Sequence, residues 1–432
     1  MTLGIQAQNT ALTLDSCFAL ARANNVKMMT NQLEIQKARE VKAQVYTKYF
    51  PQVSMSMFSY YAVRPVIEYG VNDINQETDF GQFVVSVIQF LTNAGSDMPT
   101  EVSTLKDGIG ANMLAVAPVY AGGRIANGNR LANLGIEAAQ LQAEVSERDL
   151  MEEIETSYYL VLGLQEKEQT LNSALALIDS LDHTVETALK AGLITNNDKL
   201  RVALKRNELQ ANQLQLSNGI VLASRLLCHQ IGIAYPEEGL TLENNLDQEE
   251  VQSDPGHGFF RPERRLLQLQ VESENFFKKL AIGEALPQVA VGSLTSYGNL
   301  TGKTKLNNIF FATVAVPLTQ WWETSHKIKE HDIKIREAEL MRDDLNGMMD
   351  LQEKQAFNQM LEAEALLRSD HAALEMAQEN SRLAHLNYRA GMNTIADVLE
   401  ADALLFQAQN AITDRQISWA SARRRYHDLT GK

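Results

Sequence analysis

The residue types that most often carry catalysis or bind metals occur in this chain, but their spacing fits no reaction centre. Eight histidines are scattered without a His-Glu-x-x-His arrangement, so a metal centre is not expected. The stretch Gly298–Thr304 resembles a phosphate-binding loop, yet it is one residue short and lies between two expected strands. No Ser/His/Asp or Cys/His set has a context that supports nucleophilic catalysis. We therefore predict no catalytic residue, no cofactor and no metal, and a protein that is not an enzyme.

Charge and cysteine content exclude further classes of protein. The net charge of −15 argues against nucleic acid as a partner, because phosphate binding needs a basic surface. Cys17 and Cys228 are too few for a disulfide scaffold, and two isolated buried thiols are favoured over a pair. No apolar run is long enough for a transmembrane helix. Transmembrane β-strands would not be detected in this way, because apolar and polar residues alternate along them. Residues Met1–Gln8 are either the stump of a signal peptide or an ordinary terminus.

One stretch of the sequence occurs twice, a constant 199 residues apart. Lys190–Leu200 and Arg389–Glu400 each read as a helix end followed at once by a helix start. In each, a glycine that should adopt the left-handed conformation stands two residues after the cationic residue, and a Thr-x-x-Asp capping box opens the next helix. Pro118 and Pro317 are separated by the same offset. The sequence thus predicts an internally duplicated helical hairpin.

Long helices dominate the expected secondary structure. Residues 12–49 read as one helix that stops at Pro51, and residues 124–190 contain no proline and are rich in helix formers. The latter segment would be roughly 100 Å long. Further helices are expected over residues 195–231, 262–285, 321–388 and 394–429. No globular domain needs helices of this length, so the pattern indicates a stalk.

Four short segments alternate in polarity and predict strands near residues 51–63, 109–120, 287–297 and 308–317. Their length suits a tilted strand that crosses a bilayer. Four strands cannot close a barrel alone, and an open edge cannot lie in lipid. Several copies must therefore share one barrel, and three copies would supply about twelve strands.

The order and spacing of these pieces resemble the TolC family of outer-membrane efflux proteins over nearly the whole chain. The motifs that carry the resemblance are the Pro-Gln-Val strand starts at Pro51 and Pro287, Val119–Arg124, Tyr158–Leu162, and the second turn, Tyr388–Ala401. The resemblance implies an α+β membrane protein with four strands per chain. They would contribute to a trimeric, twelve-stranded outer-membrane β-barrel continued by a long α-helical barrel in the periplasm.

The function implied by the resemblance is a passive exit duct of a tripartite efflux or type I secretion system. Its partners would be two further copies of the chain, a periplasmic adaptor (membrane fusion) protein, an inner-membrane pump of the RND or ABC type, and outer-membrane lipid. Iris-like opening of the periplasmic helix tips would gate it. The rival interpretation, from a different class, is a soluble helical-hairpin scaffold or adaptor, for which no barrel would form.

The resemblance also assigns roles to individual residues. It implies a gate or constriction at Asp397 and Glu400, and closed-state links at Asp198, Tyr388 and Asn393. Asn393 stands where some relatives carry an arginine that ties the gate shut. Adaptor docking would involve the tip-turn residues Gly192, Leu193, Gly391 and Met392. Capping alone also accounts for Asp397, but not for Glu400.

We expect three segments along the chain. Residues 1–232 form the first structural repeat with a tip turn near 190–198, residues 233–260 an equatorial linker, and residues 261–432 the second repeat with a tip turn near 389–397. Any external loop function rests mainly on residues 64–108. Trp321 and Trp322 fit an interfacial aromatic girdle and helix core about equally well.

Overall fold

The structure is a computed structural model that describes residues 11–64, 67–70, 74, 77–93, 101–104, 107–192, 194–244, 261–298 and 305–430. The chain divides into two compact units. The sheet unit comprises residues 40–134 and 272–335, and the helical unit comprises residues 1–39, 135–271 and 336–432. Each unit draws residues from both predicted repeats, so the repeat boundaries remain predictions.

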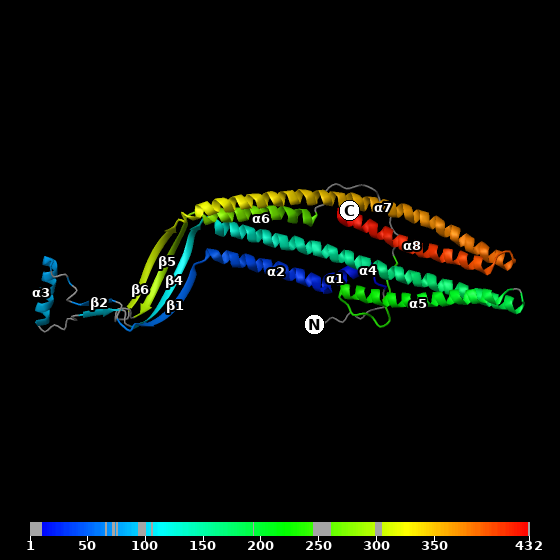
Figure 1. Ribbon diagram of the computed structural model, residues 1–432, viewed down its shortest axis with the longest axis horizontal. Coiled ribbons are helices and arrows are strands. Elements are labelled where there is room, and N and C mark those ends of the chain that lie inside the picture. The colour runs from blue at the N-terminus through cyan, green and yellow to red at the C-terminus, as the bar shows by residue number, and fades with distance from the viewer. Residues whose placement is uncertain are drawn as a thin grey trace. The chain divides into compact units, whose positions relative to one another are not determined.

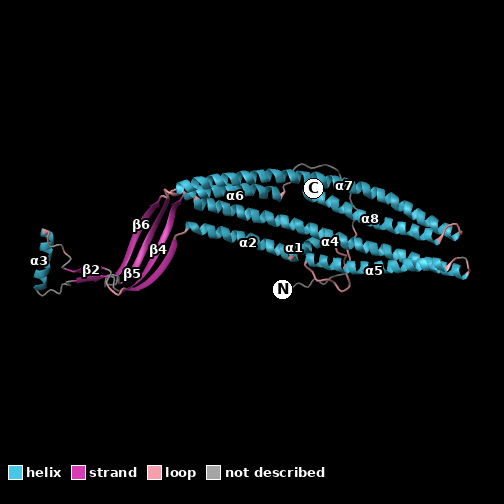
Figure 2. Cartoon of the chain, viewed as in Figure 1, coloured by secondary structure: helices cyan, strands magenta, loops and turns pink. Residues whose placement is uncertain are grey.

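Four antiparallel strands form the sheet of the sheet unit (Figure 2). They are β1 (Gln52–Tyr61), β4 (Asp107–Ala121), β5 (Gln288–Gly298) and β6 (Lys305–Ala315), in the spatial order β1-β4-β5-β6. All four predicted strands are therefore present. The register shifts between Pro118 and Tyr120, as expected where proline supplies no N–H to the ladder.

Aromatic rings cover glycines on one face of this sheet. A β-carbon on Gly110 would lie 2.6 Å from the Phe58 ring, and one on Gly108 would lie 2.7 Å from the Tyr60 ring. Phe311 covers Gly292 in the same way. Because glycine lacks a side chain, the rings of neighbouring strands fill the space above it and help to fix the register.

The segment between β1 and β4 contains more regular structure than the sequence predicts. A two-stranded ribbon pairs β2 (Ile67–Gly70) with β3 (Glu101–Thr104), and α3 (Asp79–Asn93) lies between them in the chain. The helix α3 is fifteen residues long, within a segment that the sequence marks only as a candidate external loop. Phe83 and Phe90 on that helix are largely exposed.

The N-terminal helix is broken, and its prediction as a single helix over residues 12–49 is wrong. It comprises α1 (Leu14–Asn24), α2 (Val26–Tyr46) and the 3₁₀ turn η1 (Thr47–Tyr49). Asn25, between α1 and α2, has extended backbone with ψ of 133°, and its side-chain amide donates to the Gln230 carbonyl at 2.6 Å. This long-range hydrogen bond stabilises a break that local propensity does not show.

The remaining helices begin and end within a few residues of their predicted bounds (Figure 1). They are α4 (Arg124–Lys190), α5 (Asn196–Ile231), α6 (Pro262–Glu284), α7 (Gln320–Arg389) and α8 (Ile395–Thr430). Proline, glycine and capping residues mark most of these ends, which is why the sequence shows them. No helix in the described ranges has an apolar stretch long enough to cross a membrane.

The largest core of the helical unit lies where α1, α4 and α5 meet. Ile154, Val161, Leu227 and Ile231 are fully or almost fully buried there, together with both cysteines. Cys17 and Cys228 are free thiols, in agreement with the preference for unpaired cysteines, and burial raises the pKa of Cys17 to about 12. These thiols pack as small apolar side chains.

Backbone hydrogen bonds join the described part of the linker to the residues just before α1. Leu12 and Leu242 form a parallel β-bridge, in which the Leu12 N–H donates to the Thr241 carbonyl at 3.0 Å. The Tyr158 hydroxyl lies 2.7 Å from the Glu243 carbonyl and 3.1 Å from the Leu12 carbonyl. One tyrosine of α4 thereby contacts both segments of the bridge. The rest of the predicted linker, residues 245–260, lies outside the described residues.

Candidate gate at the helix tips

Both predicted tip turns end a long helix through a left-handed glycine. Gly192 after α4 has φ of 73°, and Gly391 after α7 has φ of 75°. In the second turn, the Gly391 N–H donates to the Tyr388 carbonyl and the Met392 N–H to the Asn387 carbonyl, at 3.0 and 2.8 Å. This pair of bonds is the Schellman motif, which satisfies the last carbonyls of the helix. The predicted glycine conformation is confirmed at both turns.

Each turn continues directly into a capped helix. The Thr195 N–H and hydroxyl donate to the Asp198 carboxylate at 3.0 and 2.7 Å, and the matching bonds of Thr394 to Asp397 measure 2.7 and 2.8 Å. These hydrogen bonds hold the pKa of both carboxyls below the usual range, since they favour the charged form. Both predicted capping boxes are therefore present, and both aspartates are ionised at neutral pH.

The proposed closed-state residues Asp198 and Tyr388 lie in the same region but are not hydrogen-bonded to each other. The Tyr388 hydroxyl is buried and has no hydrogen-bond partner within the described part of the chain. Burial, and secondarily the negative charge of Asp198, raise the pKa of Tyr388. The Asp198 carboxylate is engaged by its capping threonine. Tyr388 thus presents an unused donor close to a carboxylate.

The other predicted site residues occupy the second turn and the first turns of α8. Asp397 and Glu400 are both exposed, and Glu400 makes no ion pair or hydrogen bond with the residues that the structure describes. Asn393 is half-buried, and Met392 is 72% exposed. Leu193, expected at the first tip, lies outside the described residues. The two carboxylates and the exposed methionine are therefore available to a partner or to passing ions.

A polar cluster that the sequence analysis missed links the two helices of the second hairpin. His385 Nε2 lies 3.0 Å from both carboxylate oxygens of Asp402, and the Ser381 hydroxyl donates to Asp402 at 2.6 Å. The Asp402 side chain is nearly buried, so these bonds compensate its loss of hydration. Ser381 and His385 are four residues apart on one helix face, but only the fold shows that Asp402 lies opposite.

No group of three His, Cys, Asp or Glu side chains among the described residues is arranged to hold a metal ion. The described residues of the tips show a left-handed glycine at each turn, two capped helix starts, and exposed carboxylates at the start of α8. Such an arrangement can attract cations or contact another protein.

Comparison with known proteins gives both a family match and a common fold. Residues 279–432 match the family model of the outer membrane efflux protein. No curated protein matches the sequence. Among solved structures, the chain is similar to the Campylobacter jejuni CmeC outer membrane channel, with 12% identity, a TM-score of 0.78, and coverage of 97% of this chain and 85% of that chain.

Two further structures show the same likeness. The outer membrane protein VceC of Vibrio cholerae has 14% identity and a TM-score of 0.76, over 97% of this chain and 96% of that chain. The open state of the Neisseria gonorrhoeae MtrE outer membrane channel has 13% identity and a TM-score of 0.74, over 97% of this chain and 88% of that chain.

The resemblance to the TolC family is thereby confirmed, by the efflux-family match in the C-terminal part and by the fold over nearly the whole chain. The chain has the predicted combination of long helices and a small four-stranded sheet. The matched family and structures are outer-membrane efflux proteins and channels, not enzymes, as expected for this chain.

Proposed function

We propose that this chain, which has the fold of outer-membrane channels, is one protomer of a homotrimeric exit duct in a tripartite efflux or type I secretion system. The duct lies in the bacterial outer membrane and extends into the periplasm. It passively conducts drugs or other substrates that a pump and adaptor deliver. The family match over residues 279–432 and the likeness to outer-membrane channels support this proposal.

The observation that carries the proposal is a sheet with two unpaired edges. β1 pairs only with β4, and β6 pairs only with β5, among the described strands. Because all three pairings are antiparallel, β6 of one copy would also run antiparallel to β1 of the next. A ring of copies therefore closes without reversing a strand, and three copies give about twelve strands.

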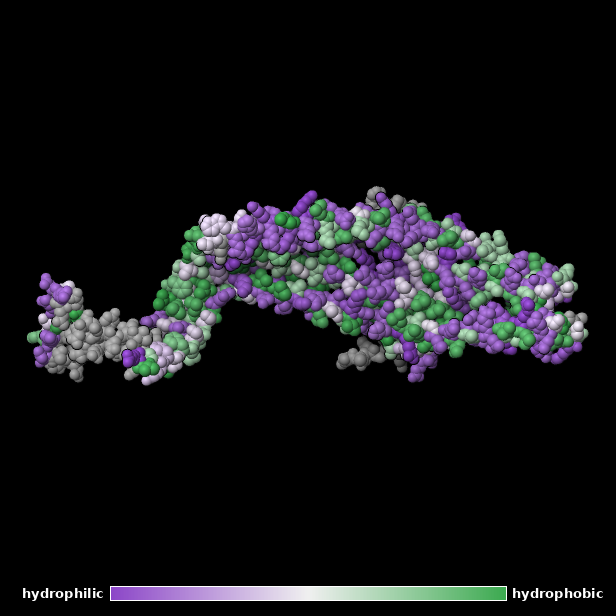
Figure 3. All heavy atoms as spheres, in the orientation of Figure 1, coloured by the Kyte–Doolittle hydropathy of each residue, from purple (hydrophilic) through white to green (hydrophobic). Residues whose placement is uncertain are grey.

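The two faces of the sheet differ in a way that suits a membrane barrel. One face carries exposed apolar side chains on all four strands, among them Val53, Met55, Met57, Ile109, Met113, Val291, Phe310 and Val314. Figure 3 shows apolar residues gathered over the visible part of the sheet. Three polar residues of this face, on β5 and β6, bond to one another: the hydroxyls of Ser293 and Thr295 lie 2.9 and 3.4 Å from Asn308 Oδ1.

The opposite face, which also carries Phe58, Tyr60, Ile309 and Phe311, has one polar row that crosses every strand. Ser56, Asn112, Ser296 and Asn307 are register neighbours on β1, β4, β5 and β6. Side chains of a membrane barrel alternate between lipid and lumen. We therefore assign the face of Met55 and Phe310 to outer-membrane lipid and the polar row to the water-filled lumen.

The tips would supply the gate and the docking site. Asp397 and Glu400 are proposed as the constriction, with Asp198, Tyr388 and Asn393 as links that hold the closed state. Gly192, Leu193, Gly391 and Met392 would meet the periplasmic adaptor, which connects the duct to an inner-membrane pump. The exposure of Met392 and Glu400 supports these roles. Iris-like movement of the hairpins would open the duct.

The decisive experiment measures the mass and conductance of the full chain extracted in a mild non-ionic detergent. A trimer that forms ion-conducting pores in planar bilayers is expected. A monodisperse monomer would refute the shared barrel. The rival function, a soluble scaffold or adaptor, predicts full solubility without detergent and no pores. The exposed apolar face of the sheet disfavours this rival.

A further inference from the structure

A cavity of about 790 Å³ in the helical unit contains charged groups that the channel proposal does not use. It is lined by α4, the start of α6, the middle of α7 and the end of α8. This volume is in the range of small-molecule sites. Its apolar wall is provided by α7, through Leu345, Met348, Met349 and Leu366.

Two of the lining residues are buried, oppositely charged and incompletely paired. Glu155 is 6% exposed and Arg261 is 4% exposed. Glu155 Oε1 and Arg261 Nη2 have no hydrogen-bond partner in the described structure. The nearest cation to Glu155 is Arg424, whose Nε lies 4.0 Å from the other carboxylate oxygen, Oε2. The Nε–H of Arg261 donates to the Leu429 carbonyl at 3.3 Å. Such orphaned buried groups are rare in native proteins because each costs free energy.

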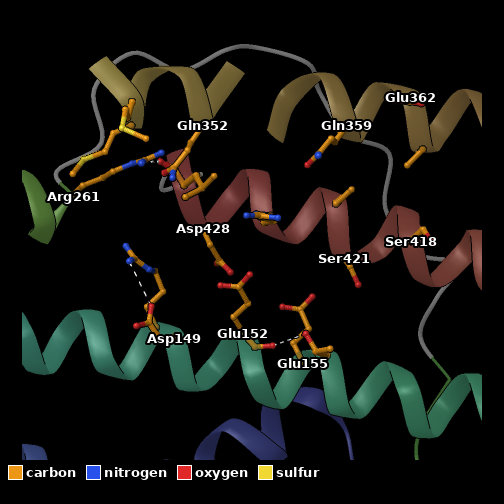
Figure 4. Close-up of a pocket in the computed structure, with 18 of the residues that line it drawn as sticks. Asp149, Glu152, Glu155, Arg261, Gln352, Gln359, Glu362, Ser418, Ser421 and Asp428 are labelled. Carbon is orange, nitrogen blue, oxygen red and sulfur yellow. Dashed lines mark hydrogen bonds and ion pairs between the residues drawn. The ribbon is translucent and has the colours of Figure 1, made fainter. Parts of the chain in front are cut away.

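The two groups do not pair with each other because other side chains lie between them. Figure 4 shows Arg261 at one end of the cavity, Glu152 and Asp428 between Arg261 and Glu155, and Ser418 and Glu362 beyond Glu155. Arg148 pairs with Glu263, which is two residues from Arg261 in the chain. Arg148 also lies seven residues before Glu155 on α4. Seven residues correspond to about 10 Å along a helix. One end of the cavity therefore holds the incompletely paired guanidinium group of Arg261, and the acidic residues Glu152, Glu155 and Asp428 lie farther along it.

The charge around each end follows from the helices that meet there. Around Glu155, burial raises the pKa of its carboxyl to about 8. Arg424 opposes this increase, and Asp428 of α8 and Glu152 of α4 add to it. At the other end, burial lowers the pKa of Arg261, although Glu353 and Glu263 lie near it. The Glu155 carboxyl and the Arg261 guanidinium each keep one polar atom without a partner, which a ligand of opposite charge would supply.

We propose that this cavity binds a zwitterionic organic molecule with an anionic oxygen group at Arg261, a protonated amine at Glu155, and an apolar body against the methionines of α7. The separation of the two ends sets the distance between the ligand's charges. The flexible thioethers of Met348 and Met349 accommodate apolar groups of different shape. The site does not depend on whether the protein conducts, so it goes beyond the proposed duct function.

The test is calorimetric titration of the full-length protein in non-ionic detergent with three probes of one chain length. These are 8-aminooctanoate, octylamine and octanoate. The zwitterion should bind about tenfold more tightly than either singly charged probe, since each end contributes a charge-assisted hydrogen bond. The shorter zwitterion 4-aminobutanoate cannot reach both ends and should bind about tenfold more weakly than the long one. Equal affinities for the probes, or no binding, would overturn the proposal.

Matched variants separate the two ends. Glu155→Gln should weaken binding of 8-aminooctanoate about tenfold and leave octanoate binding unchanged, whereas Arg261→Gln should weaken octanoate binding and spare octylamine. Glu208→Gln on α5, a residue outside the cavity, is the control and should change neither affinity. Melting curves would confirm folding, and Glu155→Asp replaces Glu155→Gln if the latter unfolds. Unchanged affinities in the folded variants would refute the site, even if the protein forms pores.

Discussion

The backbones of Gly122 and Gly283 approach each other too closely for either residue to carry a side chain. A β-carbon on Gly122 would overlap the Gly283 carbonyl, and one on Gly283 would lie 2.6 Å from the Gly122 carbonyl oxygen. Gly122 also has φ of 61°. This contact joins the end of β4 to the last turn of α6 within the sheet unit. It gives a physical reason for the glycine pair in the Val119–Arg124 motif.

Substitution of the two neighbouring glycines should therefore have unequal effects. Gly123→Ala places a β-carbon 3.6 Å from the nearest atom, Asn127 Nδ2, so only the left-handed backbone is penalised, by about 1 kcal/mol. Gly122→Ala adds a clash with backbone that cannot rotate away, and should destabilise the protein several-fold more. Thermal unfolding of the two variants measures the difference. Equal losses would show that the close approach does not constrain the sequence.

The buried carboxyl of Glu155 should make stability depend on pH. Its pKa of about 8 in the folded protein exceeds that of an unfolded glutamate, so the folded state binds the extra proton. The resulting stabilisation is complete below the ordinary glutamate pKa and is lost as pH rises through about 8. Urea unfolding between pH 5 and 8.5 should show declining stability, and Glu155→Gln should flatten this decline. A parallel curve for the variant would contradict the assignment.

Most helix ends and all four long strands could be predicted because local chemistry marks them. Gly192, Gly391 and the two capping boxes act within a few residues of their own positions. The break at Asn25 could not be predicted, since its cause is a hydrogen bond to Gln230, 205 residues away. The clusters around Asp402 and Glu155 could not be predicted for the same reason. They join helices whose facing residues become neighbours only in the folded chain.

Tyr158 should stabilise the attachment of the linker. Tyr158→Phe removes the hydroxyl that reaches the Glu243 and Leu12 carbonyls, at a cost of about 1–3 kcal/mol for the lost bond and the acceptors left without it. Tyr159→Phe is the matched control, because no hydrogen bond of its hydroxyl to the described residues is found. Hydrogen exchange at the Leu12 and Glu243 amides should accelerate only in the first variant. Equal exchange rates in the two variants would show that contacts other than the Tyr158 hydroxyl stabilise the bridge.

The second tip turn can be tested against a glycine inside a helix. Neither Gly391 nor Gly347 of α7 has an atom within 4 Å of the position of a new β-carbon. Gly391→Ala should destabilise the turn by about 1 kcal/mol because of its left-handed backbone, whereas Gly347→Ala should stabilise the helix by a similar amount. Opposite shifts of the melting temperature are expected. Shifts of the same sign would reject this description of the turn.

The proposed gate predicts a difference between the two turns in ion selectivity. If Asp397 and Glu400 line the constriction of a trimer, Asp397→Asn with Glu400→Gln removes charge at the narrowest point, and cation preference in planar bilayers should fall. Because screening weakens such effects, the difference from the parent should shrink as salt concentration rises.

The control removes charge from the first turn. Asp198→Asn keeps a side-chain oxygen that can accept the hydrogen bond from the Thr195 N–H. Because the proposal places Asp198 away from the constriction, the cation preference of this variant should equal that of the parent. Asp198→Ala, which removes the carboxylate that the proposal links to Tyr388, should instead raise the conductance. If the Asp397 and Glu400 variant keeps the selectivity of the parent, both residues lie off the ion path. Asp397 would then serve only as a cap, a role that its hydrogen bonds to Thr394 already explain.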